Sequence, residues 1–150
     1  MLYTISEAAS QIGLTAPTLR FYDKEGLLPF VDRSKSGIRM FKPSDIEWLR
    51  LIECLKATGM PIKDIKQFID WYMVGDSTLS ERRDMFYERK RAVEAQLQQL
   101  QRTLDTIRYK CWFYDTAVEA GSSEAAQQFP LDKMPEAIRR YKLALHSEEE

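Results

Sequence analysis

Apolar residues along the chain recur mostly at helical spacing, and the segments between them are short and rich in glycine, proline and hydroxyl residues. Near the N-terminus these positions run from residue 5 to 12. Thr4 precedes them at capping-box distance from Glu7, and Gly13 follows them. The pattern therefore predicts a short helix that begins after Thr4 and ends at Gly13.

A second short helix follows at once. Thr15 is a suitable N-cap, Pro17 is tolerated in the first turn, and Gly26 stops the helix after Glu25. Two short helices joined by a turn that contains glycine are typical of a helix-turn-helix. The second helix has an unusual run, Arg-Phe-Tyr-Asp-Lys over 20–24, which suits neither a purely buried nor a purely solvated helix.

In residues 28–41 the apolar positions no longer follow helical spacing. Apolar residues 28–31 precede a polar stretch, DRSKSG over 32–37, and further apolar residues stand at 38, 40 and 41. This pattern predicts two short strands around a turn, the form of a β-wing.

Two further helices are predicted after the wing. Ser44 and Glu47 have capping-box spacing and open a helix that runs to about Thr58. Pro61 starts the next helix, which carries apolar residues on one face and ends near Gly75.

The third region is a long helix with a heptad seam. Thr78 and Glu81 form its predicted capping box. Apolar residues then alternate at intervals of four and three, which is typical of a coiled coil. The seam consists of Val93, Leu97, Leu100, Leu104, Ile107, Cys111 and Tyr114. A hairpin within the chain could cover it, but no second seam of equal length exists, so a partner chain is favoured.

These patterns predict a mainly α protein with a winged helix-turn-helix domain over 1–75, a dimerisation helix over 76–118 and a short helix and tail over 119–150. The last helix is expected within 132–145, and the final HSEEE is expected to be disordered.

Charge is unevenly distributed. The net charge is −1, but residues 15–42 carry six basic and three acidic side chains, a local net charge of +3. Residues 67–150 carry twelve basic and fifteen acidic side chains, a net charge of −3. A local basic surface can contact phosphates while the rest of the chain stays acidic.

Several classes of protein are disfavoured by the same residues. Cys54 and Cys111 match no metal or disulfide spacing, and His146 stands beside an acidic end. We therefore predict no catalytic residue, no metal site and no cofactor. No signal peptide or membrane span is recognisable, so we expect a cytoplasmic protein without a membrane partner.

The residues resemble the MerR family of bacterial transcription regulators. The resemblance rests on YTISEAASQIGLTAPTLRFYDKEGLLP, on Arg-Met-Phe after the wing, and on DIEWLRLIECLKATGMPIKDIK, and it covers residues 1 to about 115. It implies an N-terminal winged helix-turn-helix and a long helix that pairs antiparallel with that of a second subunit, so that the protein is a homodimer.

The resemblance also implies roles for residues. The second helix would lie in the major groove, the wing would lie along the flanking backbone, and a lysine of a later helix would contact phosphate. Phe21 stands where many members have a second tyrosine. The DNA-binding set implied is Thr15, Pro17, Thr18, Arg20, Tyr22, Arg33, Lys35, Arg39 and Lys56. For Tyr22 the ring can pack while the hydroxyl reaches phosphate.

The implied partner is double-stranded promoter DNA with a palindromic site, which an activated dimer kinks so that RNA polymerase can use the promoter. A helical adaptor that pairs through the seam without binding DNA is the main non-enzymatic rival, and steep salt dependence of DNA binding would exclude it.

The signal is less defined. The segment after Tyr114 lacks cysteine, which argues against a soft-metal sensor. Cys54, in ECLKATGMP, resembles the cysteine of the branch that responds to aldehydes and other electrophiles, and Arg50 one turn earlier could favour its thiolate. Cys54 can equally be a small buried residue, and a non-covalent ligand is the alternative signal. Cys111 and the aromatic clusters FIDWYMV and YKCWFY are interpreted mainly as packing residues.

Overall fold

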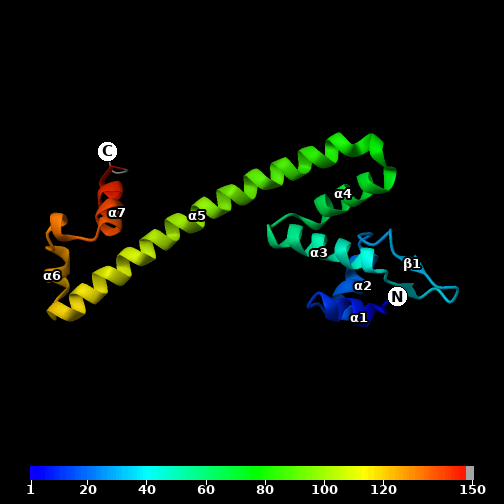
Figure 1. The fold of residues 1–150 in the computed structure, drawn as a ribbon, viewed down its shortest axis with the longest axis horizontal. Helices are drawn as coiled ribbons and strands as arrows, with labels where there is room; N and C mark the ends of the chain where they lie inside the picture. Colours follow the sequence, from blue (N-terminus) through cyan, green and yellow to red (C-terminus); the bar gives the residue numbers. More distant parts are fainter. Residues whose placement is uncertain (148–150) are drawn as a thin grey trace. The chain divides into compact units, whose positions relative to one another are not determined.

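The computed structural model describes residues 1–147 as helices joined by tight turns, with one small hairpin (Figure 1). Residues 148–150, part of the segment predicted to be disordered, lie outside the described residues. The other two residues of that segment continue a helix, so the prediction was wrong for them. The chain divides into two compact units, Met1–Val93 and Glu94–Glu150.

The elements of the first unit follow the predicted order. They are α1 (Ile5–Gln11), α2 (Ala16–Lys24), β1 (Asp32–Arg33), β2 (Arg39–Met40), α3 (Pro43–Ala57), α4 (Ile62–Val74) and the 3-10 turn η1 (Asp76–Thr78). The long helix α5 (Leu79–Ala120) begins in the first unit and ends in the second. The second unit adds α6 (Ser123–Gln127), the 3-10 turn η2 (Leu131–Lys133) and α7 (Glu136–Ser147).

The helix-turn-helix is fixed by local signals. Thr4 forms the predicted capping box, because its Oγ1 accepts from the Glu7 N–H at 3.3 Å and its own N–H donates to the Glu7 carboxylate at 2.8 Å. Thr15 caps α2 through the Thr18 N–H. Gly13 and Gly26 end the two helices at φ of 70° and 79°, the left-handed region that favours glycine.

The wing forms, but its first strand is displaced. Strand β1 lies within the stretch predicted to be the polar loop, and it pairs antiparallel with β2 in the register Asp32–Met40 and Arg33–Arg39. Leu28 and Val31, which were expected to lie in that strand, are buried in the core instead. Because these apolar residues pack in the core, the pairing of β1 with β2 begins only at the polar residues Asp32 and Arg33.

Two predicted capping boxes are wrong. Helix α3 begins at Pro43 rather than after Ser44, and the Lys42 N–H donates to the Asp45 carboxylate at 2.9 Å. The Thr78 hydroxyl does not cap α5; it donates back to the carbonyls of Trp71 at 2.5 Å and Gly75 at 2.8 Å. At α3 the capping interaction lies two residues earlier than predicted, and at α5 the turn η1 precedes the helix, with the Leu79 N–H donating to the Asp76 carbonyl.

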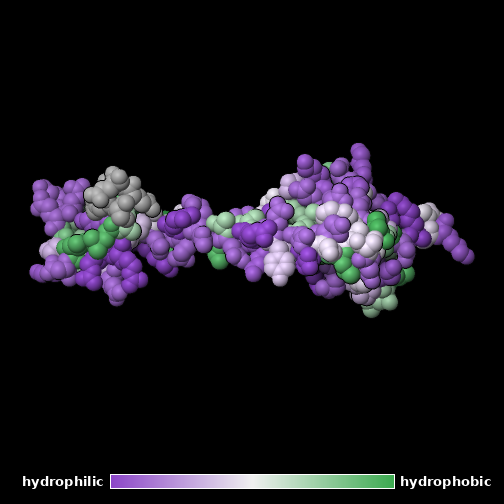
Figure 2. All heavy atoms as spheres, turned by 90° about the horizontal axis from the view of Figure 1, so that it is seen from above, coloured by the Kyte–Doolittle hydropathy of each residue, from purple (hydrophilic) through white to green (hydrophobic). Residues whose placement is uncertain are grey.

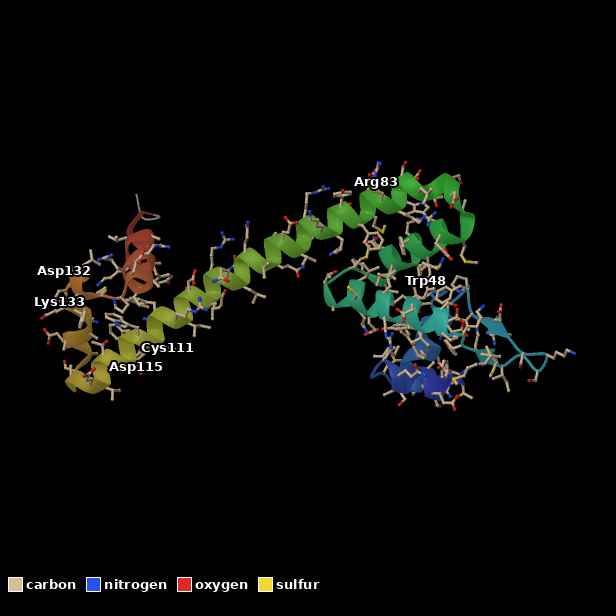
Figure 3. The ribbon with its side chains drawn as sticks, in the orientation of Figure 1. Trp48, Arg83, Cys111, Asp115, Asp132 and Lys133 are labelled. Atoms are coloured by element: carbon tan, nitrogen blue, oxygen red, sulfur yellow. The ribbon has the colours of Figure 1, made fainter. Side chains whose placement is uncertain are left out.

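The core of the first unit joins every helix of the N-terminal region. Helices α1 to α4 each contribute buried side chains, and Met85 on the first part of α5 packs against them. The buried residues are Ala8, Ala9, Leu19, Tyr22, Leu27, Leu28, Val31, Phe41, Ile46, Leu49, Ile52, Leu55, Met60, Ile65, Phe68 and Ile69. Trp48 on α3 packs on Tyr72 of α4, with ring centroids 4.4 Å apart (Figure 3).

The second unit has a smaller core at the C-terminal part of α5. Phe113 and Ala117 pack with Ala126 of α6, and Trp112 meets Phe129 edge-on at 5.2 Å. Helix α7 is held to α5 by Tyr141, whose hydroxyl lies 2.9 Å from that of Thr106. The predicted helix within 132–145 therefore forms, although it begins at Glu136.

No helix in the described part of the chain combines the length and the apolar character needed to cross a bilayer.

Candidate nucleic-acid interface

Helix α2 presents polar and basic side chains on the face opposite the core. Leu19 and Tyr22 are fully buried, whereas Thr15, Pro17 and Arg20 are exposed. The exposed set includes the N-cap and the first turn, where backbone N–H groups lack helical partners. Of the α2 residues assigned to DNA, these three lie on the exposed face, whereas Thr18 is half-buried and Tyr22 is buried.

Phe21 extends the same surface with an apolar ring. It is 48% exposed, and its ring centroid lies 6.1 Å from that of Tyr22. An exposed aromatic side chain beside Arg20 can cover sugar and backbone atoms, but it has no hydroxyl with which to bind phosphate.

Tyr22 is bound inside the domain by its hydroxyl as well as by its ring. The hydroxyl donates to the Glu53 carboxylate and accepts from the Lys56 ammonium at 2.9 Å. Burial raises the pKa of Tyr22, and the hydrogen bond to Glu53 raises it further. The ring packs as predicted, and the hydroxyl is hydrogen-bonded within the domain; its contact with phosphate stays a prediction.

Lys56 stays exposed at the surface of α3 while it contacts Tyr22. Its ammonium lies 5.3 Å from the centre of the Tyr22 ring, and the hydrogen bond to the hydroxyl raises the pKa of Lys56. Lys56 therefore carries a full positive charge whose position is fixed by a residue of α2.

The two wing arginines are engaged with Asp23 of α2. Arg39 Nη2 lies 2.5 Å from Asp23 Oδ1, and Arg33 Nη2 lies 3.2 Å from Asp23 Oδ2. Arg39 also donates to the Val31 carbonyl, and Arg33 to the Gly37 carbonyl at 2.7 Å. These residues were predicted to bind DNA, and the structure shows that they also tie the wing to α2.

The wing tip is a tight turn that keeps Lys35 exposed. Ser34 closes the turn, since its N–H donates to the Ile38 carbonyl at 2.8 Å and its carbonyl accepts from Gly37 at 2.9 Å. Within residues 1–147, Arg20, Lys24 and Lys35 are exposed and form no ion pair, whereas Lys42 pairs with Asp32 at 2.9 Å. The unpaired cations of this region therefore lie on α2 and at the wing tip.

Asp23 and Glu53 are the residues that sequence reasoning missed. Each is an acidic residue on the predicted DNA-binding surface, and each binds a residue that had been assigned to DNA. Their partners lie 10, 16 and 31 residues away in sequence, so no local spacing marked the pairs. The only signal was an acidic residue at position 23, within the last turn of a helix, where carboxylates are unfavourable.

Cys54 is exposed on α3, so its interpretation as a small buried residue is wrong. Arg50 donates to Glu47 at 2.7 Å. Cys111 is also exposed, on the seam of α5 (Figure 3). Across the described residues, no cluster of three or more histidine, cysteine or acidic side chains could hold a metal ion.

Comparisons with known proteins agree with this geometry. The family profile described as "MerR HTH family regulatory protein" matches residues 3–70, and the profile "MerR, DNA binding" matches residues 46–109. A Haemophilus influenzae protein described as an uncharacterized HTH-type transcriptional regulator is 46% identical over 136 residues, which is 91% of this chain and 98% of that protein. The Bacillus subtilis regulator AdhR is 38% identical over 91 residues, 60% of this chain and 65% of that protein.

Solved structures give the same result. The crystal structure of HiNmlR, described as a MerR family regulator lacking the sensor domain and bound to promoter DNA, has a TM-score of 0.76 and 48% identity. The likeness covers 83% of this chain and 99% of that chain. A MerR family regulator from Bacillus thuringiensis has a TM-score of 0.69 and 42% identity, over 74% of this chain and 97% of that chain.

Fold and site define a winged helix-turn-helix regulator that binds DNA. The chain belongs to the MerR family of transcriptional regulators, and it is therefore not an enzyme. The predicted family and fold class are confirmed.

Proposed function

We propose that this regulator acts as a homodimer that binds a palindromic promoter site through α2 and the wing and distorts it in response to a signal. The observation that carries the proposal is that the chain exposes two separate surfaces suited to binding a partner. One is the face of α2 and the wing tip with its unpaired cations, and the other is the exposed apolar seam of α5.

The DNA contacts divide by chemistry. Arg20 carries an exposed guanidinium on α2 and can fork onto a base edge or a phosphate. Thr15, Pro17 and Thr18 would pack along the groove, while Lys35 and Lys56 would contact flanking phosphates. Arg33, Arg39 and Tyr22 would support these contacts from within the domain, because their polar atoms are engaged there.

The dimer proposal rests on side chains that this chain leaves exposed. Leu97 is 65% exposed, Leu100 66% and Ile107 54%, and Figure 2 shows hydrophobic surface between charged groups along the middle of α5. Seven such positions at heptad spacing are unfavourable in water unless a second helix covers them. The proposed seam is Val93, Leu97, Leu100, Leu104, Ile107, Cys111 and Tyr114.

A two-fold dimer requires a two-fold site, so the operator should be an inverted repeat. Deformation of the DNA between the half-sites would supply part of the sequence preference and would present the promoter to RNA polymerase. A regulator of this kind would act in the cytoplasm.

Selection from a random-sequence pool tests the DNA proposal directly. The wild-type protein should enrich an inverted repeat, and Arg20→Ala should lose most of its affinity for the enriched duplex, a loss of about 1–3 kcal/mol per subunit. Arg91→Ala is the matched control, because Arg91 is exposed on α5 at a position outside the seam. If no sequence is enriched, or if both variants bind equally well, the interface is wrongly assigned.

We further propose that Cys54 senses an electrophile. Its support is that the thiol is exposed, one residue after Glu53 and two before Lys56, the α3 residues that hold the Tyr22 hydroxyl. With an α,β-unsaturated aldehyde, the Cys54 sulfur would bond to the β-carbon and the α-carbon would take up a proton. The adduct contains every atom of both reactants, and it would alter the exposed surface of α3 in the DNA-binding domain.

Intact mass and operator affinity, before and after exposure to such an aldehyde, test this signal. The DNA complex should change, and in Cys54→Ala that change should vanish together with the mass of one aldehyde per chain. Cys111→Ala is the control, since its thiol is also exposed. A modified Cys54 that leaves the DNA complex unchanged would refute the sensor.

A non-covalent ligand is the second candidate signal, and one observation favours it. A cavity of about 450 Å³ lies between α5 and α7, lined by Arg102, Asp105, Thr106, Ala137, Arg140, Tyr141, Ala144 and Leu145. Its volume and its mixture of apolar and convergent polar groups suit a small organic molecule. Loss of response to a ligand in Ala137→Trp, with the aldehyde response unchanged, would distinguish the two signals.

A further inference from the structure

Asp23 stands at a position that local helix chemistry disfavours. It lies in the last turn of α2, where the carbonyl end of the helix repels a carboxylate. Its side chain is only 22% exposed, so little water solvates it. A residue that violates a local rule is retained where a tertiary contact or a function requires it.

The contact is a single carboxylate that holds both strands of the wing. Oδ1 accepts from Arg39 at 2.5 Å and Oδ2 from Arg33 at 3.2 Å. These two arginines face one another in the β1–β2 register. Each also donates its second Nη to a wing carbonyl, that of Val31 or Gly37, so each guanidinium joins Asp23 to the wing backbone.

Arg39 depends on this contact. Its side chain is 20% exposed, and within the described residues its buried Nε has no hydrogen-bond partner. Among the described residues, Asp23 is the one carboxylate paired with this guanidinium, so its removal would leave a partly buried cation.

We propose that Asp23 is a positioning residue that determines specificity. It holds Arg33 and Arg39 so that the wing and α2 form one rigid unit, which sets the register between groove contacts and flanking phosphate contacts. The same contact withholds two guanidinium groups from phosphate, so Asp23 weakens sequence-independent attraction while it sharpens sequence-specific binding. This inference rests on the proposed function of α2 and the wing.

The test compares Asp23→Asn with Asp32→Asn. Both remove one negative charge from the same region, but Asp32 is 77% exposed and pairs only with Lys42 among the described residues. Affinity is measured for the duplex enriched by the wild-type protein and for a scrambled duplex of equal length, each at several salt concentrations. Circular dichroism and thermal unfolding check that each variant is folded.

For Asp23→Asn we expect the ratio of specific to scrambled affinity to fall about tenfold or more. Binding to scrambled DNA should hold or tighten, with a steeper salt dependence, since up to two more cations per subunit can meet phosphate, each adding about 0.9 to the slope. Asp32→Asn should shift both affinities together. Asp23→Glu keeps the charge and should recover part of the ratio.

A ratio for Asp23→Asn within about twofold of that for Asp32→Asn would overturn the inference. If Asp23→Asn does not fold, Arg33→Lys decides, because it keeps the charge but cannot bridge Asp23 and Gly37 with two nitrogens; an unchanged ratio there also overturns it. If the wild-type protein does not distinguish the two duplexes, the proposed function fails instead.

Discussion

Residues 1–93 share one core of buried apolar side chains, whereas the seam positions of α5 from Val93 onward are exposed. Leu49 and Ile65 have no exposed surface, while Leu97 and Leu100 are about two-thirds exposed. The first region has the core of an independent domain, and the seam has the pattern of an interface. We therefore expect the DNA-binding head to fold alone, and the proposed dimer would cover the seam of the long helix. Four changes test this contrast.

Leu100→Asp should have the largest effect. In the proposed dimer each copy would place a carboxylate in an apolar seam, which costs several kcal/mol. The dissociation constant of the dimer should rise at least about 100-fold, since each 1.4 kcal/mol is a factor of ten. Analytical ultracentrifugation measures it, with Gln98→Asp, exposed on the outer face of α5, as the control. A Leu100→Asp variant that stays dimeric would show that the seam of α5 is not the dimer interface.

Leu49→Ala should come next. Its side chain is fully buried in the first unit, and its truncation should lower the free energy of unfolding by about 2–5 kcal/mol. This loss should not depend on protein concentration, because the cavity lies within one chain. Leu97→Ala is the matched change on the seam, and its effect should shrink as the protein is diluted. Denaturant titration at two protein concentrations separates the two variants. If the stability losses of Leu49→Ala and Leu97→Ala depended equally on protein concentration, the two regions would not differ as proposed.

Tyr22→Phe should lower the free energy of unfolding by about 1.5–3 kcal/mol, the range for a hydrogen bond to a charged group. It also has a pH signature. The pKa of Tyr22 is raised by burial and by Glu53, and that of Lys56 by its bond to Tyr22. Raised values give stability that is present at neutral pH and lost as pH rises above the unfolded values, about 10 for tyrosine.

The wild-type protein should therefore lose stability above about pH 10, and Tyr22→Phe should lose less over the same range. Thermal unfolding between neutral pH and the alkaline limit measures this, with Tyr87→Phe, which is 57% exposed, as the control. If Tyr22→Phe lost as much stability at alkaline pH as Tyr87→Phe does, the buried hydroxyl of Tyr22 would not contribute to the loss.

Thr4→Ala should have the smallest effect, about 1 kcal/mol, because it removes the N-cap of α1. The loss should be independent of concentration, as for any change confined to the first unit. Ser10→Ala, an exposed hydroxyl later in α1, should change the melting temperature little. Equal shifts for both changes would show that the cap contributes nothing measurable.

Local signals predicted the helices well because they act over a few residues. The caps at Thr4 and Thr15 and the glycine stops at Gly13 and Gly26 all lie where the sequence indicated. The capping prediction for Thr78 was wrong, since its hydroxyl donates back to the carbonyls of Trp71 and Gly75 at the end of α4 rather than forward to α5. Strand β1 begins later than predicted because Leu28 and Val31 are buried in the core instead of pairing in the wing.

The candidate site was predictable only in part. Arg20 was assigned to DNA by the resemblance to the MerR family, and the structure places it on the exposed face of α2. The state of Arg39 and Tyr22 could not, because it depends on Asp23 and Glu53, which are distant along the chain. Sequence spacing shows which side chains can reach a surface, but the ion pairs decide which of them are available there.

The tryptophans give the two regions separate optical signals. Trp48 lies among Phe30, Phe68 and Tyr72 in the first unit, and Trp112 packs edge-on against Phe129 in the second. Fluorescence of a Trp112→Phe variant should follow the DNA-binding head, which also holds Trp71 of α4, and that of a Trp48→Phe, Trp71→Phe double variant should follow the C-terminal unit. Without any attached dye, the chain can then report whether its two parts melt together or one after the other.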